Sequence, residues 1–141
     1  MAGMGCSQLI ALQKKLQTFQ KSGQEQICRE SAEELADKLL KAVKKRTPLE
    51  GYPPGNVPPG NTLREGWILS DIRRQGNRYV VTISNPIEYA SHVEYGYQDD
   101  KNVKWVPGRF MLAISLRELQ SVSSAFLREK LEEKLKGVLT L

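Results

Sequence analysis

The sequence predicts an α+β fold, in which a small antiparallel sheet (a hairpin plus one or two further strands) is packed by an N-terminal helix pair and a long C-terminal helix. Apolar residues recur every three or four positions in the first 46 residues and again after residue 109. Two runs of strand-forming residues lie between these regions, and proline and glycine separate them from the helices. The length of 141 residues predicts a single domain over residues 1–141.

Two helices are expected at the N-terminus. Ser7 is a suitable N-cap for the first helix, whose apolar face consists of Leu9, Leu12, Leu16 and Phe19. The pair Ser22–Gly23 should break or kink this helix. The second helix should run from about Gln24 to Arg46, with a four-residue ladder of Ile27, Ser31, Leu35, Leu39 and Val43. It ends at Thr47–Pro48, because the residue before a proline avoids helical backbone angles.

Residues 48–62 are rich in proline and glycine, which predicts a stiff, exposed arm that is ordered against a neighbour. The alternative is a proline motif that another domain binds. Residues 67–72 and 79–84 then predict an antiparallel hairpin. The segment Arg73–Arg78 supplies its turn, with Gly76–Asn77 at the tip, and its arginines make that tip basic.

The region from residue 86 to residue 112 mixes aromatic residues, small residues and helix breakers. It predicts a short helix over 87–95 that Gly96 stops, a polar turn over 97–102 and a third strand over 103–106. Residues 96–107 together are expected to form an exposed contact loop. A long helix should follow from about Arg109 to Leu135, with Gly137 as its C-cap.

The charge and the cysteine content limit the kinds of function that the chain can have. The net charge is +5 and the isoelectric point is about 9.3, which serves solubility; the alternative is an acidic partner such as nucleic acid. Cys6 and Cys28 have no metal-ligand spacing and are expected to be buried or half-buried free thiols, with a disulfide between the two helices as the alternative. No lipidation signal and no run of membrane-spanning length occurs, so we expect a soluble protein made in the cytoplasm.

A search for chemistry gives no catalytic residue, no cofactor site and no metal site. His92 is the single histidine, and the adjacent Ser91 would point in a different direction on a helix. Glu88 and Glu94 would face largely opposite sides of a short helix, so they do not form a carboxylate dyad. Asp99–Asp100 lacks companion ligands, and no phosphate-binding loop is present. We therefore do not expect an enzyme.

Protein binding fits more of the sequence. Six residues of the types that anchor interfaces fall close together: Tyr89, Tyr95, Tyr97, Trp105, Arg109 and Phe110. The alternative for Tyr89, Trp105 and Phe110 is that about half of them only cap the core. Three residues of the hairpin turn could face the phosphates of DNA, namely Arg73, Arg74 and Arg78. No known base-reading motif accompanies them.

Four blocks occur in order and carry a resemblance: Arg46-Thr47-Pro48, Leu63-Arg64-Glu65-Gly66-Trp67, residues 85–96 with Tyr-Ala-Ser-His-Val-Glu-Tyr-Gly, and Trp105-Val-Pro-Gly-Arg-Phe-Met-Leu112. Together they resemble the HK97-type phage tail-component family of tailed phages and prophages, over nearly the whole chain from about Leu9.

The resemblance implies a structural protein of the virion, made in the bacterial host cytoplasm. It implies a homo-oligomeric ring, with a hexamer as the expected state, at the neck or head-proximal end of the tail. The implied partners are other copies of the chain and neighbouring neck, tail-tube or head-completion proteins. No catalytic residues come with the family. The alternative function is a small DNA-binding regulator or a packaging accessory protein.

Overall fold

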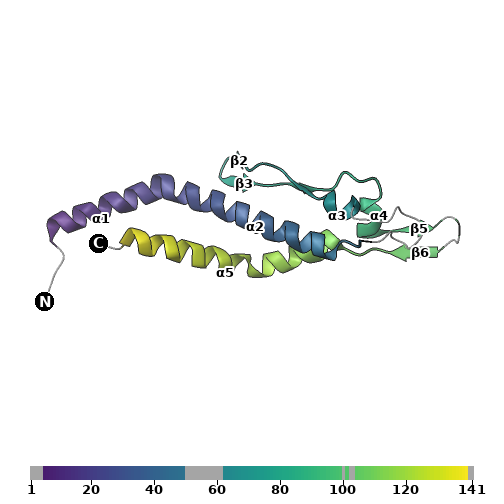
Figure 1. Ribbon diagram of the computed structural model, residues 1–141. Helices are drawn as coiled ribbons and strands as arrows, with labels where there is room; N and C mark the ends of the chain where they lie inside the picture. The colour runs from purple at the N-terminus through teal and green to yellow at the C-terminus, as the bar shows by residue number, and fades with distance from the viewer. Residues whose placement is uncertain (1–4, 50–61, 100, 102–103, 140–141) are drawn as a thin grey trace.

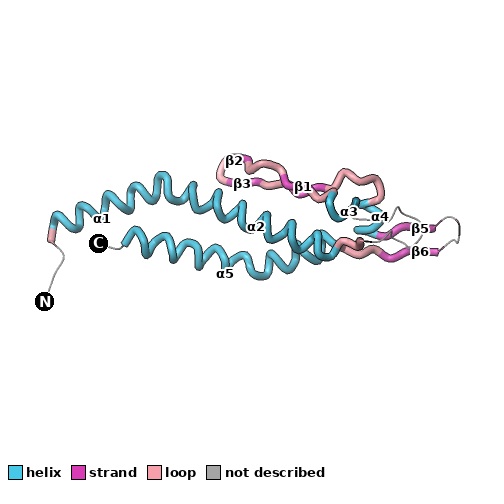
Figure 2. The backbone as a smooth tube through the Cα atoms, in the orientation of Figure 1, coloured by secondary structure: helices cyan, strands magenta, loops and turns pink. Residues whose placement is uncertain are grey.

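The computed structural model describes residues 5–49, 62–99, 101 and 104–139. The molecule is elongated (Figure 1). Two long helical arms lie side by side, both termini are at one end, and short strand pairs occur along one arm and at the opposite end (Figure 2). The expected α+β class is confirmed, with the difference that the strands of the described residues pair in three separate two-stranded ladders rather than in one sheet. The proposed arm at residues 48–62 lies mostly outside the described residues.

The N-terminal arm comprises α1 (Cys6–Thr18), a π-helical turn η1 (Phe19–Gly23) and α2 (Gln24–Arg46). The expected break at Ser22–Gly23 is this π turn, which lets the helix continue. A Cβ at Gly23 would lie 2.7 Å from a ring carbon of Phe19, so glycine makes room for that ring. The predicted N-cap at Ser7 is wrong, because α1 already begins at Cys6 and Gly5 precedes it. The bounds of α2 are those predicted.

The C-terminal arm is α5 (Met111–Leu139), which packs against α2. The pairing is antiparallel, since contacts at rising α5 positions meet falling α2 positions: Glu118 with Arg46, Lys130 with Glu34, and Lys134 with Glu30. Exposed ion pairs of this kind contribute at most about 1 kcal/mol each, so they set the register more than the stability. The predicted C-cap at Gly137 is wrong, because the helix continues through it to Leu139.

Two residues of these ion pairs, Lys130 and Glu30, have pKa values shifted from their usual ones. The hydrogen bond from Lys130 to the Glu34 carboxylate raises the pKa of Lys130 above its usual value. The side-chain amide of Gln26 donates to Glu30 and lowers the pKa of that carboxyl, with a further contribution from Lys134. Both shifts favour the charged forms that the α2–α5 contact uses.

The central hairpin consists of two ladders in line. β1 (Ile68–Leu69) pairs with β4 (Ile83–Ser84), and β2 (Arg73–Gln75) pairs with β3 (Arg78–Val80) around the predicted Gly76–Asn77 tip. Between the ladders, Ser70 N–H donates to the Thr82 carbonyl at 2.8 Å, and Thr82 N–H donates to Ser70 Oγ at 2.8 Å. The Ser70 hydroxyl therefore takes the place of a backbone acceptor where the strands are interrupted.

Two short helices and one more strand pair complete the end of the molecule that is remote from the termini. They are α3 (Thr62–Glu65), α4 (Ala90–Tyr95), β5 (Gly96–Asp99) and β6 (Lys104–Pro107). The expected polar turn at 97–102 is wrong in part, because Tyr97–Asp99 belong to β5, which pairs with β6. The role of residues 96–107 as a contact segment stays a prediction. α4 begins three residues later than expected.

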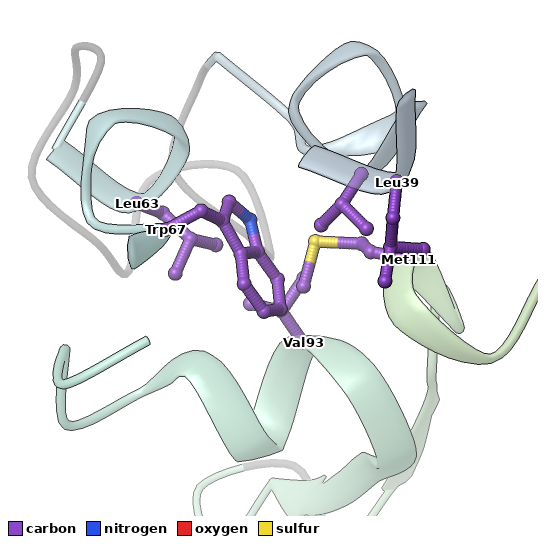
Figure 3. Close-up of a cluster of buried hydrophobic side chains, with 6 residues drawn as sticks. Leu39, Leu63, Trp67, Val93 and Met111 are labelled. Carbon is purple, nitrogen blue, oxygen red and sulfur yellow. The ribbon is translucent and has the colours of Figure 1, made fainter. Parts of the chain in front are cut away.

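The hydrophobic core lies where these elements meet. Its buried side chains come from α2, α3, the residue before β1, α4 and α5, namely Leu39, Val43, Leu63, Trp67, Val93 and Met111. Figure 3 shows these side chains converging around the Trp67 indole. No residue of α1 is buried, and both Cys6 and Cys28 are exposed free thiols, so the expectation of buried or half-buried thiols is wrong.

Thr47 is a buried polar residue that joins the core elements. Its hydroxyl donates to the Val43 carbonyl at 2.7 Å and accepts the Trp67 indole N–H at 2.8 Å. The Arg64 guanidinium donates to the Thr47 carbonyl, through Nη2 at 2.7 Å. The end of α2, the end of α3 and the core tryptophan are thus tied to one residue.

Replacing Thr47 with valine keeps the side-chain shape but leaves the Trp67 indole N–H without its acceptor. We expect Thr47→Val to lower the free energy of unfolding by about 1–3 kcal/mol in urea denaturation followed by circular dichroism. The exposed Thr82→Val is the matched control and should stay within about 0.5 kcal/mol of the parent. In a double-mutant cycle, Trp67→Phe should cost about 1 kcal/mol less in the Thr47→Val background, and strict additivity would contradict the proposed hydrogen bond.

Candidate protein interface

The segment from α4 to the start of α5 folds back on itself around Glu94. That side chain is only 6% exposed. Its Oε2 accepts the Leu112 N–H at 2.9 Å, and its Oε1 accepts the Ala113 N–H at 3.0 Å. The first N–H groups of a helix have no partner within the helix, and its N-terminus carries partial positive charge. The Glu94 carboxylate therefore caps α5 from a different element.

Backbone hydrogen bonds also connect the end of α4 to the residues that precede α5. We name this connection, together with the Glu94 cap, the joint. Arg109 N–H donates to the Val93 carbonyl at 2.7 Å, and Phe110 N–H donates to the Glu94 carbonyl at 3.0 Å. A Cβ at Gly108 would lie 2.4 Å from that Glu94 carbonyl oxygen, so only glycine fits there. Phe110 has a φ of 49°, a left-handed conformation that is unfavourable for an aromatic residue. The contacts on either side of Phe110 hold it in that conformation.

Three exposed aromatic side chains lie around the β5–β6 ladder: Tyr95 ends α4, Trp105 is in β6, and Phe110 directly precedes α5. Tyr95 is 67% exposed, Trp105 is 64% exposed and Phe110 is 43% exposed. Gly96 has a φ of 88°, and a Cβ there would lie 2.8 Å from an indole carbon of Trp105. Glycine is therefore required at position 96 for two reasons: it adopts the left-handed backbone, and it leaves room for the Trp105 indole. Large exposed aromatic side chains on a fixed backbone are typical of protein-binding surfaces.

The six residues predicted as interface anchors occupy two kinds of environment. Tyr95, Trp105, Arg109 and Phe110 are exposed. Tyr97 is half-buried and stacks on His92, with ring centroids 5.1 Å apart. Tyr89 is half-buried and packs against the core. We name Tyr95, Trp105 and Phe110 the aromatic end; that its members bind a partner stays a prediction.

The three arginines predicted to face DNA lie on the β2–β3 hairpin, away from the aromatic end (Figure 1). Arg73 and Arg78 are exposed. Arg74 forms an ion pair with Glu25 of α2 at 3.3 Å and lies 5.9 Å from the centre of the Tyr79 ring. Desolvation by burial is the main cause that raises the pKa of Tyr79, and the charge of Glu25 adds to it. The hairpin tip is thus attached to α2, and contact of these arginines with DNA remains a prediction.

Sequence reasoning considered Glu94 only as a catalytic carboxylate and missed its role in the joint. A usable signal was present, since Glu94 follows Val93 on a short helix where a helical period places core residues. A charged residue that is buried needs hydrogen-bond donors, and an N-terminus of a helix supplies them. Which helix supplies them depends on tertiary contacts that the sequence does not display.

Comparison with known families gives one match. The model of the family described as "Bacteriophage HK97-gp10, putative tail-component" matches residues 10–96, which is more than half of the chain. The chain belongs to this family. The tail-component match ends at Gly96, so the block Trp105–Leu112, which also suggested the family, lies outside the matched residues. Neither a curated protein nor a solved structure matches the sequence.

Family membership identifies the chain as a phage tail component and implies a place in the tail of the virion, in contact with other tail proteins. Among the described residues, no helix has both the length and the hydropathy needed to cross a bilayer. The matched region contains the greater part of α1, together with α2, the central hairpin and α4. It therefore includes Glu94 and Tyr95, whereas Trp105 and α5 are supplied by the rest of the chain.

Replacing Glu94 with alanine leaves two N–H groups of α5 without a partner. We expect Glu94→Ala to lower the free energy of unfolding by about 2–3 kcal/mol, because charge-assisted hydrogen bonds to a helix N-terminus are lost. Glu94→Gln keeps one acceptor oxygen, so its free energy of unfolding should lie between those of the parent and Glu94→Ala. The measurement is urea denaturation, with exposed Glu88→Gln as the control. Equal stability of Glu94→Ala and Glu88→Gln would contradict the capping role.

Proposed function

We propose that this tail component is a structural subunit that assembles as a ring, a hexamer, at the neck or head-proximal end of the tail. In that position it serves tail completion or head–tail joining, with neighbouring neck, tail-tube or head-completion proteins as its partners. It acts by binding and not by catalysis. The observation that carries the proposal is the aromatic end, a set of exposed anchor residues on a chain that belongs to a phage tail-component family.

The physical case rests on preorganisation. Binding orders side chains and loops, and each immobilised side chain costs roughly 0.5–1.5 kcal/mol. The Glu94 cap and the close contacts at Gly108 already fix the backbone that carries Tyr95 and Phe110. Trp105 is likewise seated on Gly96. A partner that covers the aromatic end therefore gains aromatic burial without paying for most of the loop ordering.

A role near passing DNA is part of the proposal. Arg73 and Arg78 are exposed at the hairpin tip, and the net charge of the chain is +5. Such residues would meet phosphates without reading sequence. The competing function is a small DNA-binding regulator or packaging accessory, which requires tight binding of duplex DNA with a steep salt dependence. A mobility-shift titration of duplex DNA at low salt separates the two functions.

Removing the aromatic end should abolish assembly without unfolding the protein. We expect Tyr95→Ala with Trp105→Ala to change the free energy of unfolding by less than about 1 kcal/mol, because both side chains are largely exposed. The same variant should fail to join purified tail-tube or neck proteins in sedimentation velocity, and should fail to restore infectious particles to a phage that lacks the gene.

The matched control is Val122→Ala, which removes an exposed apolar side chain from α5. It should behave as the parent in both assays. A double variant that assembles and complements normally would overturn the role of the aromatic end. A parent protein that stays monomeric and binds no neck or tail component would overturn the proposed function as a whole.

A further inference from the structure

The C-terminal helix α5 repeats a short motif along its exposed surface. The triplet Leu116-Arg117-Glu118 recurs eleven positions later as Leu127-Arg128-Glu129. An α-helix has about 3.6 residues per turn, so eleven residues are close to three turns and the two triplets point in nearly the same direction. Leu116 is 40% exposed, Leu127 is 43% exposed, and both arginines are exposed. The repeat therefore presents leucine and arginine together on the outside of the helix.

The second triplet belongs to a face that is both apolar and basic. Ser124, Leu127, Arg128 and Leu131 stand at positions i, i+3, i+4 and i+7, the spacing that places side chains on one side of a helix. Leu131 is 42% exposed and lies between Leu127 and Arg128 on the helix surface. Glu132 follows Arg128 by one turn, but Arg128 forms no ion pair with any described residue. We name Ser124, Leu127, Arg128 and Leu131 the leucine–arginine face.

The arginine of this face points away from α2. Phe126 and Lys130 are the residues of α5 that contact α2 at this level, because the Lys38 ammonium lies over the Phe126 ring and Lys130 pairs with Glu34. Arg128 is two positions from Phe126 and two from Lys130, and residues two apart do not face the same way on a helix. Arg128 is therefore directed to the outside of the helix pair.

A groove of complementary character lies between α2 and the central hairpin, with a volume of about 300 Å³. Its lining combines half-buried apolar residues, Leu69, Ile72 and Val81, with exposed acidic residues, Glu33, Asp37 and Asp71. We name it the acidic groove. None of its three carboxylates forms an ion pair with a described residue, although Glu25, Glu30 and Glu34 of the same helix are paired.

The arrangement of these carboxylates favours an arginine as the occupant. Glu33 and Asp37 are four residues apart on α2, where like charges repel, and Asp71 adds a third negative charge from the hairpin. An arginine carries five N–H donors in a planar fork and can bind more than one carboxylate at once. The apolar lining beside the carboxylates suits leucine side chains. Two leucines around one arginine are what the leucine–arginine face presents.

The two surfaces of one chain cannot meet. The hairpin and α5 lie on different sides of α2 (Figures 1 and 2). Glu34 and Lys38, which contact α5, each follow a groove residue by one position, and adjacent residues of a helix point in different directions. The occupant of the acidic groove must therefore come from another molecule.

We propose that the leucine–arginine face of one copy docks in the acidic groove of the next copy. Arg128 binds the carboxylates of Glu33 and Asp37, and the two leucines lie against the apolar lining. Every copy carries one of each surface, so the chain supplies its own complementary partner. The two surfaces differ, so the contact is heterologous, and its repetition closes into a ring or continues as a filament. This inference rests on the proposed ring assembly and names a contact that builds it.

A charge swap tests the contact. Arg128→Glu places a carboxylate against the acidic groove, and Glu33→Lys with Asp37→Lys places lysines against the arginine. Each variant should self-associate at least about 10-fold more weakly than the parent in sedimentation velocity with purified neck and tail-tube proteins present, because like charges then face each other. The combined variant, which carries all three substitutions, should recover the association, since a glutamate then meets two lysines at every contact.

Matched controls separate the contact from folding and from net charge. Arg117→Glu makes the same substitution in the first triplet, where Gln120 stands in place of the second leucine. Glu88→Lys with Glu132→Lys reverses two exposed charges outside the groove. Both controls should associate within about twofold of the parent. Circular dichroism must show every variant folded.

Complementation gives a second readout. In cells infected by a phage that lacks the gene, infectious titre should be lost with Arg128→Glu and with the groove variant, and restored by the combined variant. Titre should be normal with both controls.

Three results would overturn the inference while the proposed ring survives. They are a folded Arg128→Glu or groove variant that associates like the parent, a folded combined variant that recovers neither association nor titre, and a loss with Arg117→Glu equal to that with Arg128→Glu. If Arg128→Glu weakens binding of duplex DNA or of a purified tail protein and leaves self-association unchanged, the face belongs to that ligand and the contact between copies is wrong. A parent protein that does not assemble with tail proteins contradicts the proposed function, and this contact with it.

Discussion

The capping of α5 by the Glu94 carboxylate is the interaction on which the shape of this molecule depends. It is buried, and a buried carboxylate is costly unless hydrogen-bond donors surround it. The N-terminus of α5 supplies two such donors together with the positive end of the helix dipole. This contact fixes where α5 starts and in which direction it leaves α4. The pairing of α5 with α2, and the position of the β5–β6 hairpin, follow from that direction.

A second polar residue completes the joint from the other arm. Thr47 ends α2 and holds both the Trp67 indole and the Arg64 guanidinium. Polar groups at the ends of the two long helices thus surround one small apolar core, which contains Val43 and Met111. Stability is concentrated at this end of the molecule, and the helical arms extend from it with exposed apolar residues. Such a division suits a subunit that is completed by its neighbours, which is the function we propose.

The sequence predicted the elements whose signals are local. The bounds of α2 followed from its four-residue ladder and from Pro48, and the hairpin tip followed from Gly76–Asn77. Strand β5 was missed because its polar residues resemble a turn, and only its pairing with β6 makes it a strand. Gly137 predicts a helix end because glycine commonly follows one, yet α5 continues through it. The aromatic residues of the candidate site could be named from composition, but the Glu94 joint that positions them depends on contacts between distant elements.

Amide hydrogen exchange at Leu112 and Ala113 tests the account most directly, because these two N–H groups have no acceptor in their own helix and depend on Glu94. If the joint is as described, both amides exchange only through global unfolding, with protection equal to that of the core of α2. In Glu94→Ala they should exchange rapidly while the core of α2 stays protected. Exchange of Leu112 and Ala113 in the parent protein at the rate of exposed amides would contradict the central role of the Glu94 cap.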